Sequence, residues 1–420
     1  MQSDKRSIRL TALLAIVTAT VVMAGPHAAA QAERVLHSFN NNGKDGVAPY
    51  AGLIVDAAGN LYGTTHVGGA YGGGTVFELS PKAGGGWTET VIYAFGNGTD
   101  GVFPSGSLIR DALGSLYGTT SQGNGAYSGG TAFQLTPTAG GGWTETVIHV
   151  FGNGTDGARP IGSLIFDASG NLYGTTTLGG AQNLGTVFEL APAAGGGWTE
   201  SVLHAFANLS NGFNPVGGLV FDTAGNLYGT TFLGAVAFEL RPTAGGSWEG
   251  GVIHFFSNLK DGFNPNGSLI FDASGNLYGT AGSGGANPCG GAGCGTVFEL
   301  SPRSGGGWTE KILHSFNNNG TDGYTPSDSV IFDAAGNLYG VTGSGGNNTN
   351  CGNGASCGTA FELVPTASGH WREKILHNFS NDGKDGTVPQ GRLLLKGGSL
   401  YGTTIGGGTY GYGTVFVIKP

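Results

Sequence analysis

The sequence predicts an all-β fold: a seven-bladed β-propeller with four antiparallel strands per blade, in which the N-terminal strand completes the last blade and closes the ring. Three observations support this. A Leu-Tyr-Gly step recurs at spacings of 50 to 62 residues. Short apolar runs bounded by glycine-rich turns occur along the chain, and no helical periodicity of useful length is present. The repeat is also out of phase with the chain ends. The recurring tyrosines are Tyr62, Tyr117, Tyr173, Tyr228, Tyr278, Tyr339 and Tyr401.

The third unit shows how one repeat divides into strands. Residues 162–167 form a short run rich in β-favouring side chains, and residues 168–171 form a tight turn in which Gly and Asn suit positive φ. Residues 172–176 are expected to form the second strand, residues 185–190 the third and residues 198–206 the fourth. Because sheets stacked around a ring bury both faces, runs such as Leu-Ile-Phe need not alternate with polar residues.

The order of the segments at the two ends indicates a closed ring. Six Trp-led segments ending in Phe supply a fourth strand, as in residues 87–95. The seventh copy, residues 33–39, comes first and lacks the Trp, while the chain stops after the third-strand segment 413–418. A linear β-solenoid is the alternative architecture, but it would not need this permuted strand. We therefore expect residues 33–420 to form one propeller domain.

Residues 1–32 have the pattern of a secretory signal peptide. Lys5, Arg6 and Arg9 precede an apolar run over residues 11–25, and small residues follow. The protein is therefore expected to be secreted or periplasmic. A net charge of −9 with only 11% charged residues argues against nucleic-acid binding, and no later segment suggests membrane insertion. The 85 glycines recur at fixed places, so they indicate turns and close strand packing rather than disorder.

The four cysteines form two local pairs. Cys289 lies close to Cys294, and Cys351 lies close to Cys357. In an oxidising compartment this spacing favours two short disulfides, although four cysteines permit three connectivities. A zinc site is the alternative, but the ligand spacing is unfamiliar and no His lies nearby in sequence.

Three repeated phrases carry a family resemblance. They are Gly-Asn-Leu-Tyr-Gly-Thr-Thr, Gly-Thr-Val-Phe-Glu-Leu and Asp-Gly-x-x-Pro, and together they run through essentially the whole mature chain. They resemble the GloVer (Gloeo/Verruco) tandem repeat of secreted bacterial proteins. The resemblance implies an exported repeat protein and brings no catalytic residues with it.

The variable loops indicate which face binds a ligand. In a propeller, the loops between blades and the loops between second and third strands share one face, and the latter vary most in length. The short loop at 230–234 suggests a cleft over unit four, floored by Phe232 and walled by residues 287–294 and 347–357. Packing of glycine-rich loops is the alternative role for the loop aromatics. The candidate binding residues are His66, Tyr71, Tyr127, Arg159, Asn211, Phe232, Asn287, Asn347, Tyr410 and Tyr412.

Repeated Asp and His residues receive structural interpretations. The Asp-Gly step between blades, replaced once by Asn211, suits an Asx-turn, and calcium is the alternative. One repeat position holds His in six units and Tyr93 in the other, on outer strands about 10 Å or more apart, so these histidines cannot share one ion. We therefore predict packing with one hydrogen bond at this position and no metal or cofactor. The six histidines are His37, His149, His204, His254, His314 and His377.

The polar residues outside the repeat are few, which argues against catalysis. The carboxylates that depart from the pattern reduce to Asp328 and Asp382, and no nucleophile elbow, phosphate loop or zinc-protease signature occurs. No catalytic residue is therefore assigned. The sequence favours a monomeric, non-catalytic binding or scaffold module for an extracellular polysaccharide or an envelope protein. The alternatives are a carbohydrate-active lyase or hydrolase, in which His66, Tyr71, Arg159 and Arg392 could take part, and a purely structural protein.

Overall fold

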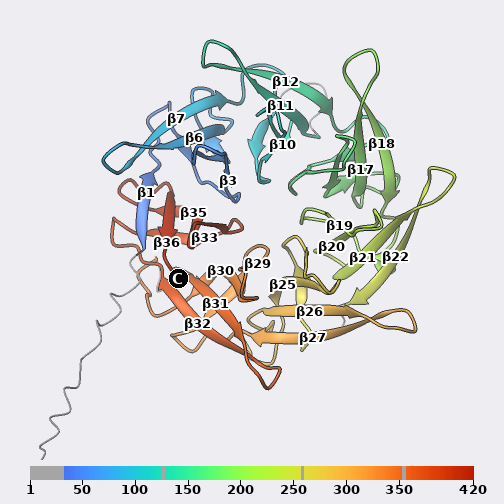
Figure 1. Ribbon diagram of the computed structural model, residues 1–420, viewed down its shortest axis with the longest axis vertical. Helices are drawn as coiled ribbons and strands as arrows, with labels where there is room; N and C mark the ends of the chain where they lie inside the picture. Colours follow the sequence, from blue (N-terminus) through green and yellow to red (C-terminus); the bar gives the residue numbers. More distant parts are fainter. Residues whose placement is uncertain (1–32, 124–128, 257–259, 352–355) are drawn as a thin grey trace, which may run out of the picture.

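Seven sheets stand around a central axis in the computed structural model, which describes residues 33–123, 129–256, 260–351 and 356–420 (Figure 1). The blades follow one another in chain order, so the prediction of an all-β seven-bladed propeller is confirmed. In the described ranges the one helical element is the 3₁₀ turn Leu209–Asn211. None of these residues forms a helix long and apolar enough to cross a membrane.

The second and third strands form the middle of each blade. They are antiparallel and lie almost wholly buried, because a blade packs against its neighbours on both faces. The second strands are β4 (Leu61–Thr65), β10 (Leu116–Gln122), β15 (Leu172–Thr176), β20 (Leu227–Thr231), β25 (Leu277–Ser283), β30 (Leu338–Gly345) and β35 (Ser399–Gly407). The third strands are β6 (Thr75–Pro81), β11 (Thr131–Pro137), β17 (Thr186–Pro192), β21 (Val236–Pro242), β26 (Thr296–Pro302), β31 (Thr359–Pro365) and β36 (Thr414–Ile418).

Six of the seven outer strands begin at the tryptophans, as expected. Each contains a β-bulge at the same place, directly before the repeated His or Tyr, so that one extra residue turns this side chain towards the next blade. The outer strands are β7 (Trp87–Ala94), β12 (Trp143–Val150), β18 (Trp198–Ala205), β22 (Trp248–Phe255), β27 (Trp308–Ser315), β32 (Trp371–Asn378) and β1 (Arg34–Ser38).

Strand β1 closes the ring. It pairs antiparallel with β36 through Arg34 opposite Val417 and Ser38 opposite Thr414. In Figure 1 this first strand lies beside the last strands of the chain. The N-terminal segment therefore supplies the outer strand of blade 7, as the phase of the repeat predicts.

The inner strands are shorter than predicted, and in six units a separate short strand precedes them in the predicted joining loop. In the third unit, pairing is confined to Ile165–Phe166 and to a separate piece, Gly157–Ala158, with Arg159 and Pro160 between them. Proline has no N–H to donate, so the ladder stops there. The pieces that end before or at the proline are β2 (Gly46–Val47), β8 (Val102–Pro104), β13 (Gly157–Ala158), β23 (Phe263–Pro265), β28 (Gly323–Pro326) and β33 (Gly386–Pro389).

The pieces after the proline line the ring centre. They are β3 (Ile54–Val55), β9 (Ile109–Arg110), β14 (Ile165–Phe166), β19 (Val220–Phe221), β24 (Ile270–Phe271), β29 (Ile331–Phe332) and β34 (Leu394–Lys396). In two units, β5 (Val67–Gly68) and β16 (Leu178–Gly179) extend the second strand to meet the first piece. In unit four, a single bridge between Phe213 and Leu233 takes the place of that pairing.

The core lies between blades rather than within them. The Phe that follows each outer strand packs on the third-strand Phe of the next blade, as Phe151 does on Phe188 at 4.9 Å between ring centroids, and both are fully buried. Six of the seven Leu-Tyr-Gly tyrosines are buried, with 4–6% of their surface exposed. Trp198 packs edge-on against Tyr117 of the preceding blade. The blades are therefore held together by the repeated aromatic residues.

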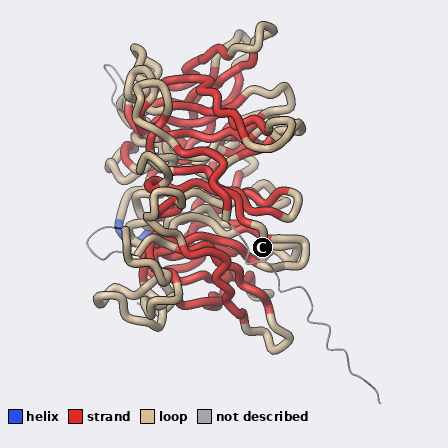
Figure 2. Tube along the Cα trace, turned by 90° about the vertical axis from the view of Figure 1, so that its left-hand side faces the viewer, coloured by secondary structure: helices blue, strands red, loops and turns tan. Residues whose placement is uncertain are grey.

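Loops occupy both faces of the ring (Figure 2). Two of the long loops carry disulfides, Cys289–Cys294 and Cys351–Cys357, and the predicted pairing is thereby confirmed. Because each bridge closes a loop of only a few residues, it stiffens that loop and does not connect blades.

Candidate functional site

A pocket of about 580 Å³ lies at the centre of the ring. Its wall is made by the starts of the inner strands and the ends of the second strands, so it lies on the face that carries the loops of variable length. Each unit contributes the residue that follows the constant proline of the inner strand. These residues differ from one another: Tyr50, Ser105, Ile161, Val216, Asn266, Ser327 and Gln390.

The mouth of the pocket is tied together across blades. Asn266 donates its side-chain amide to the Pro326 carbonyl at 3.2 Å, and Ser327 donates its hydroxyl to the Pro389 carbonyl at 3.0 Å. Deeper in the wall, Ser107 accepts from the Gly52 amide at 2.9 Å. Adjacent inner strands are therefore fixed relative to one another, and the pocket has a pre-formed shape.

The residue before each of these prolines has positive φ, from 53° to 65°. This conformation is disfavoured for non-glycine residues, most of all when a proline follows, and it is maintained here by the packing of the ring. Because the strain recurs in every unit, it belongs to the repeat itself. It brings the side chains of Phe103, Arg159 and Asn214 into the pocket wall. The seven residues are Ala48, Phe103, Arg159, Asn214, Asn264, Thr325 and Val388.

One histidine lines the pocket, and its surroundings favour the neutral ring. His66 stacks on Phe103 at 5.2 Å between centroids and meets Tyr50 edge-on at 4.9 Å. Its Nδ1 lies 3.3 Å from both the Pro104 carbonyl and the Ser105 hydroxyl. Burial lowers its pKa, and the Pro104 carbonyl only partly offsets this effect.

A second chamber of about 500 Å³ continues from the pocket along the ring axis. Its wall is mainly apolar and is formed by the repeated Leu-Ile-Phe residues of the inner strands. Asp328 and Ser268 are among the residues that line both chambers, and Arg392 lines the second. Asp328 accepts from the Ser329 amide at 2.6 Å and the Arg392 amide at 2.9 Å. Burial raises its pKa, opposed by these amides and by the Arg392 charge.

A different set of polar residues lies at the outer seams between blades. At one seam, His149 of β12 approaches Asp156 of the joining loop, with 3.0 Å between Nε2 and Oδ2, and Glu200 of the next outer strand faces both. At the position occupied by Tyr93 instead of His, the hydroxyl donates to Asp100 at 3.0 Å. The hydrogen bond predicted for the repeated His position is therefore present at these seams.

The glutamates of these seams were not connected with the histidines by sequence reasoning. Burial raises the pKa of the Glu33, Glu89, Glu145 and Glu200 carboxyls to about 7, and the nearby Asp contributes to each shift. The carboxylates of Asp and Glu at one seam come from different blades. Only the recurrent Trp-x-Glu spacing, set against the recurrent Asp-Gly step, could have signalled their approach.

Glu145 allows a test of the free-energy cost of ionising a seam glutamate. Its folded-state pKa of about 7 exceeds its ordinary value of 4.5, so folding favours the protonated form, and the free energy of unfolding falls as pH rises from about 4.5 to 7. We expect Glu145→Gln, which cannot ionise, to stabilise the chain more at pH 8 than at pH 5. Thermal melts at both pH values measure this. Glu249→Gln, at an exposed position of the next-but-one outer strand, is the control. An equal effect of Glu145→Gln at both pH values would contradict the prediction.

The sequence matches the protein family described as Gloeobacter/Verrucomicrobia repeat over residues 25–237 and again over residues 234–420. The chain belongs to this family. The resemblance seen in the repeated phrases is thus confirmed. A comparison with curated protein sequences finds no match.

The solved structures that resemble this chain are propellers, and their sequence identity to it is low. An ancestral GH74 enzyme has a TM-score of 0.56 at 10% identity, covering 93% of this chain and 50% of that one. A protein from Lactobacillus plantarum has a TM-score of 0.49 at 17% identity, covering 81% and 86%. PhoX of Pseudomonas fluorescens, in complex with vanadate, has a TM-score of 0.47 at 12% identity, covering 93% and 95%. At 10% identity, the likeness to the GH74 enzyme shows the fold alone.

The structure brings some of the predicted binding residues together and separates others. His66, Arg159 and Phe232 line the central pocket, whereas the exposed loop tyrosines Tyr71, Tyr410 and Tyr412 are not in its wall. Tyr127 lies outside the described residues. Sequence reasoning missed the residue after each proline, although its variation between two constant neighbours was visible in the repeat.

The residues expected to wall a cleft over unit four contact their own blades where the structure describes them. Asn287 donates its side-chain amide to the Ser315 and Phe316 carbonyls of its own blade, and the Asn347 amide donates to Asn378. Neither these residues nor Asn211 line the central pocket. Asn287 and Asn347 are thus held on the outer strands of their own blades.

The residues named for possible catalysis are partly grouped. His66, Arg159 and Asp328 line one pocket, and Arg392 contacts Asp328, but Asp382 lies on the outer rim beside Asp385. Asp328 provides the one carboxylate found in the two chambers among the described residues. A glycoside hydrolase mechanism that uses two carboxylates would therefore lack its second carboxylate among the described residues of these two chambers.

Proposed function

We propose that the chain is a non-catalytic binding module of the cell envelope or exterior, and that its central pocket takes a neutral polyhydroxylated ligand, most simply part of a glycan. The supporting observation is the chemistry of the pocket wall. Hydroxyl and amide groups of Ser105, Gln122, Asn266 and Gln390 alternate with aromatic rings, of which Phe232 is one. Sugars are bound by this combination of directional hydrogen bonds and aromatic faces.

The charge of the pocket supports a neutral ligand. Its described ionisable groups besides Tyr50 are Arg159, Asp328 and the histidine His66, whose pKa is lowered by burial. One cationic and one anionic side chain roughly balance, so no strong field selects an anion or a cation. A volume of about 580 Å³ lies in the range of small-molecule sites, which suits a short stretch of a polysaccharide.

Binding to a broad array of oligosaccharides and polysaccharides tests the proposal. We expect Phe232→Ala to weaken binding of the chain 33–420 about tenfold or more, because stacking on a pocket aromatic is lost. Tyr410→Ala, which removes an exposed loop aromatic outside the pocket, should bind like the parent. If Tyr410→Ala loses binding and Phe232→Ala does not, the ligand site is the loop rim. If no glycan binds, a protein partner or a purely structural role gains support.

A second candidate function is a polysaccharide lyase. The observation in its favour is that His66, Arg159 and Tyr50 share one pocket, with the Tyr50 and His66 rings 4.9 Å apart. A base near a cation that neutralises a uronate is what proton abstraction beside a carboxyl group requires. Release of unsaturated product from uronate-containing polysaccharides, absent in Arg159→Ala, would establish this activity. Intact polymer after prolonged incubation would remove it.

A further inference from the structure

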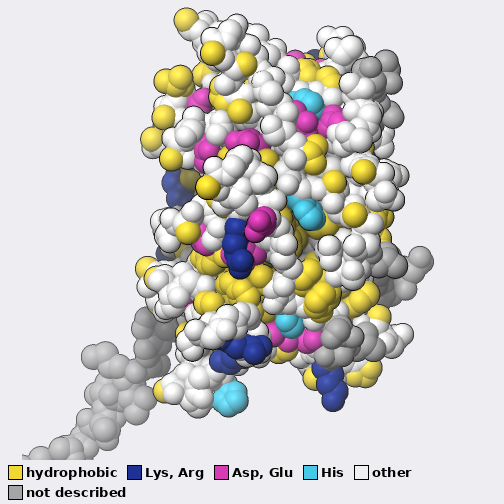
Figure 3. Space-filling view, turned by 90° about the vertical axis from the view of Figure 1, so that its right-hand side faces the viewer, with side chains coloured by type: hydrophobic (Ala, Val, Ile, Leu, Met, Phe, Trp, Pro, Cys, Tyr) yellow, Lys and Arg dark blue, Asp and Glu magenta, His cyan; other side chains and the backbone are white. Residues whose placement is uncertain are grey.

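The seams between blades carry a three-residue cluster that we call the seam cluster. It consists of the His of one outer strand, the Asp of the joining loop and the Glu of the next outer strand. In four seams one ligand atom from each residue lies within 4.8 Å of the other two. Figure 3 shows histidine side chains along one side of the ring, some of them against acidic side chains. The four clusters are Glu33, His377 and Asp385; His37, Asp45 and Glu89; His254, Asp261 and Glu310; and His314, Asp322 and Glu373.

The cluster of His314, Asp322 and Glu373 has the spacing of a metal site. His314 Nε2 lies 3.4 Å from Asp322 Oδ2 and 3.6 Å from Glu373 Oε1. His314 Nε2 and Glu373 Oε1 have no hydrogen-bond partner among the described residues. Tetrahedral ligands at about 2.0–2.1 Å from an ion lie about 3.4 Å from each other, so these separations fit one shared ion.

A second observation points to a ligand at the same place. The Asp322 side chain is only 5% exposed, and its Oδ1 also lacks a hydrogen-bond partner among the described residues. Its Oδ2 accepts from the Asn317 amide at 2.9 Å and from the Asn317 side chain at 3.1 Å, which fixes the orientation of the carboxylate. Buried polar atoms without partners are costly, and a cation beside Asp322 Oδ2 would satisfy the unpartnered His314 Nε2 and Glu373 Oε1.

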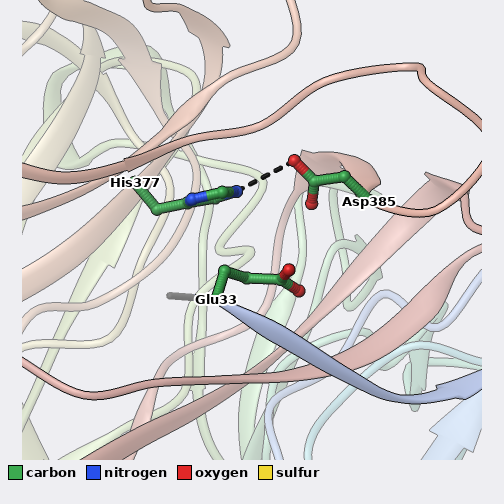
Figure 4. Close-up of side chains that lie close together, drawn as sticks. All are labelled: Glu33, His377 and Asp385. Carbon is green, nitrogen blue, oxygen red and sulfur yellow. Dashed lines mark hydrogen bonds and ion pairs between the residues drawn. The ribbon is translucent and has the colours of Figure 1, made fainter. Parts of the chain in front are cut away.

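Figure 4 shows how another seam cluster differs. His377 and Asp385 form a direct hydrogen bond, 2.9 Å between Nε2 and Oδ2, and the Glu33 carboxylate points towards them. The imidazole is thereby occupied by the neighbouring carboxylate, as His37 is by Asp45 at 3.2 Å. The separation is wider in the His314 cluster and, at 3.7 Å between His254 and Glu310, also in the His254 cluster. The His314 cluster is assigned as a metal site because both of its carboxylates lie within 4 Å of the imidazole nitrogen and Asn317 fixes one of them.

The ligand types indicate the class of ion. One imidazole nitrogen and two carboxylate oxygens suit a borderline divalent ion such as Zn²⁺ or Co²⁺. Calcium would need six to eight oxygens, which this cluster does not provide. We propose that His314, Asp322 and Glu373 bind one divalent transition-metal ion across the seam between blades 5 and 6. Solvent reaches the site, since the His314 and Glu373 side chains are 18% and 15% exposed, and water completes the coordination.

The repeat provides conservative variants for the test. Tyr93 occupies the His position at one seam and Asn211 the Asp position at another, so the fold accepts both substitutions at equivalent places. We therefore choose His314→Tyr and Asp322→Asn. His204→Tyr is the matched control, because its seam has Asn211 and Gly250 in place of the carboxylates.

The experiment measures metal bound per chain. Untagged chain 33–420 is stripped with a chelator and titrated with Co²⁺, and bound metal is counted after gel filtration while the visible Co²⁺ spectrum reports its ligands. We expect His314→Tyr and Asp322→Asn each to bind one ion fewer than the parent, and His204→Tyr to bind as many as the parent. Zn²⁺ should raise the melting temperature of the parent more than that of His314→Tyr.

Two results would overturn the assignment. One is a parent chain that retains no Co²⁺ or Zn²⁺ at micromolar concentration. The other is an unchanged count in both cluster variants, each shown by circular dichroism to be folded. Other seam clusters that bind metal would raise all the counts equally and leave the difference of one ion intact.

Discussion

Removal of residues 33–39 is expected to abolish cooperative folding of the propeller. The deletion leaves the β36 edge unpaired and removes Phe39, which is fully buried against Phe77 at 5.1 Å between ring centroids. Truncating one buried Phe costs about 3–5 kcal/mol, and a whole domain is stable by about 5–15 kcal/mol. The lost strand pairing and burial of Leu36 add to this. Chemical denaturation followed by tryptophan fluorescence should show no native baseline, and the exposed edge should promote aggregation.

A permuted chain controls for the loss of sequence as such. Residues 33–42 are moved behind residue 420, joined by the 366–370 turn that connects the third and outer strands of blade 6. The same strand can then pair with β36 from the other end of the chain, so we expect native melting to return. A truncated chain that melts like the parent would show that β1 does not hold the ring.

The second large effect is expected at the glycine of the Leu-Tyr-Gly step. A Cβ on Gly174 would lie 2.6 Å from Phe188 Cζ and 2.9 Å from Leu164 Cδ2, and both side chains are at most 1% exposed. No neighbour can yield without opening the interface between blades 2 and 3. Overpacking of this kind costs about 1–3 kcal/mol, so Gly174→Ala should lower the free energy of unfolding by roughly 3 kcal/mol.

Two further variants separate overpacking from other effects of alanine. Gly195→Ala, in an exposed turn where a Cβ meets nothing within 4 Å, should unfold like the parent. Phe188→Leu makes room beside Gly174 and should be less harmful when combined with Gly174→Ala than the two single effects predict. Additive effects in this double-mutant cycle would exclude a steric cause. The free energies of unfolding come from urea unfolding of the parent, the single variants and the double variant.

The fold was predictable because its determinants repeat locally. The strand at Leu172–Thr176 has the predicted bounds, and the closure by residues 33–39 follows from the phase of the repeat. The disulfide partners were also predictable, since the two cysteines of each pair lie within a few residues of each other in sequence. Turn chemistry, strand length and loop closure act over short stretches of chain, which is why pattern reasoning reaches them.

The sites were less predictable because they form between units. The seam position of Glu373 beside His314 depends on the curvature of the ring, which brings two outer strands together across a blade boundary. The pocket residues Ser105 and Asn266 come from different blades and meet only around the axis. The short strand Gly157–Ala158 was missed for another reason, since it lies in the predicted joining loop and the positive φ of Arg159 before a proline runs against local preference. Tertiary packing outweighs the local preference there.

The pairing of Arg34 with Val417 also sets the order of events during biosynthesis. The ribosome makes β1 before all other strands of the ring and its partner β36 after them, so β1 waits unpaired until the intervening strands have been produced. Contacts between such distant segments form slowly, and ring closure should be the late step of folding. It also acts as a check on completeness. A chain that terminates early lacks β36 and cannot complete the ring, whatever the quality of the blades already formed.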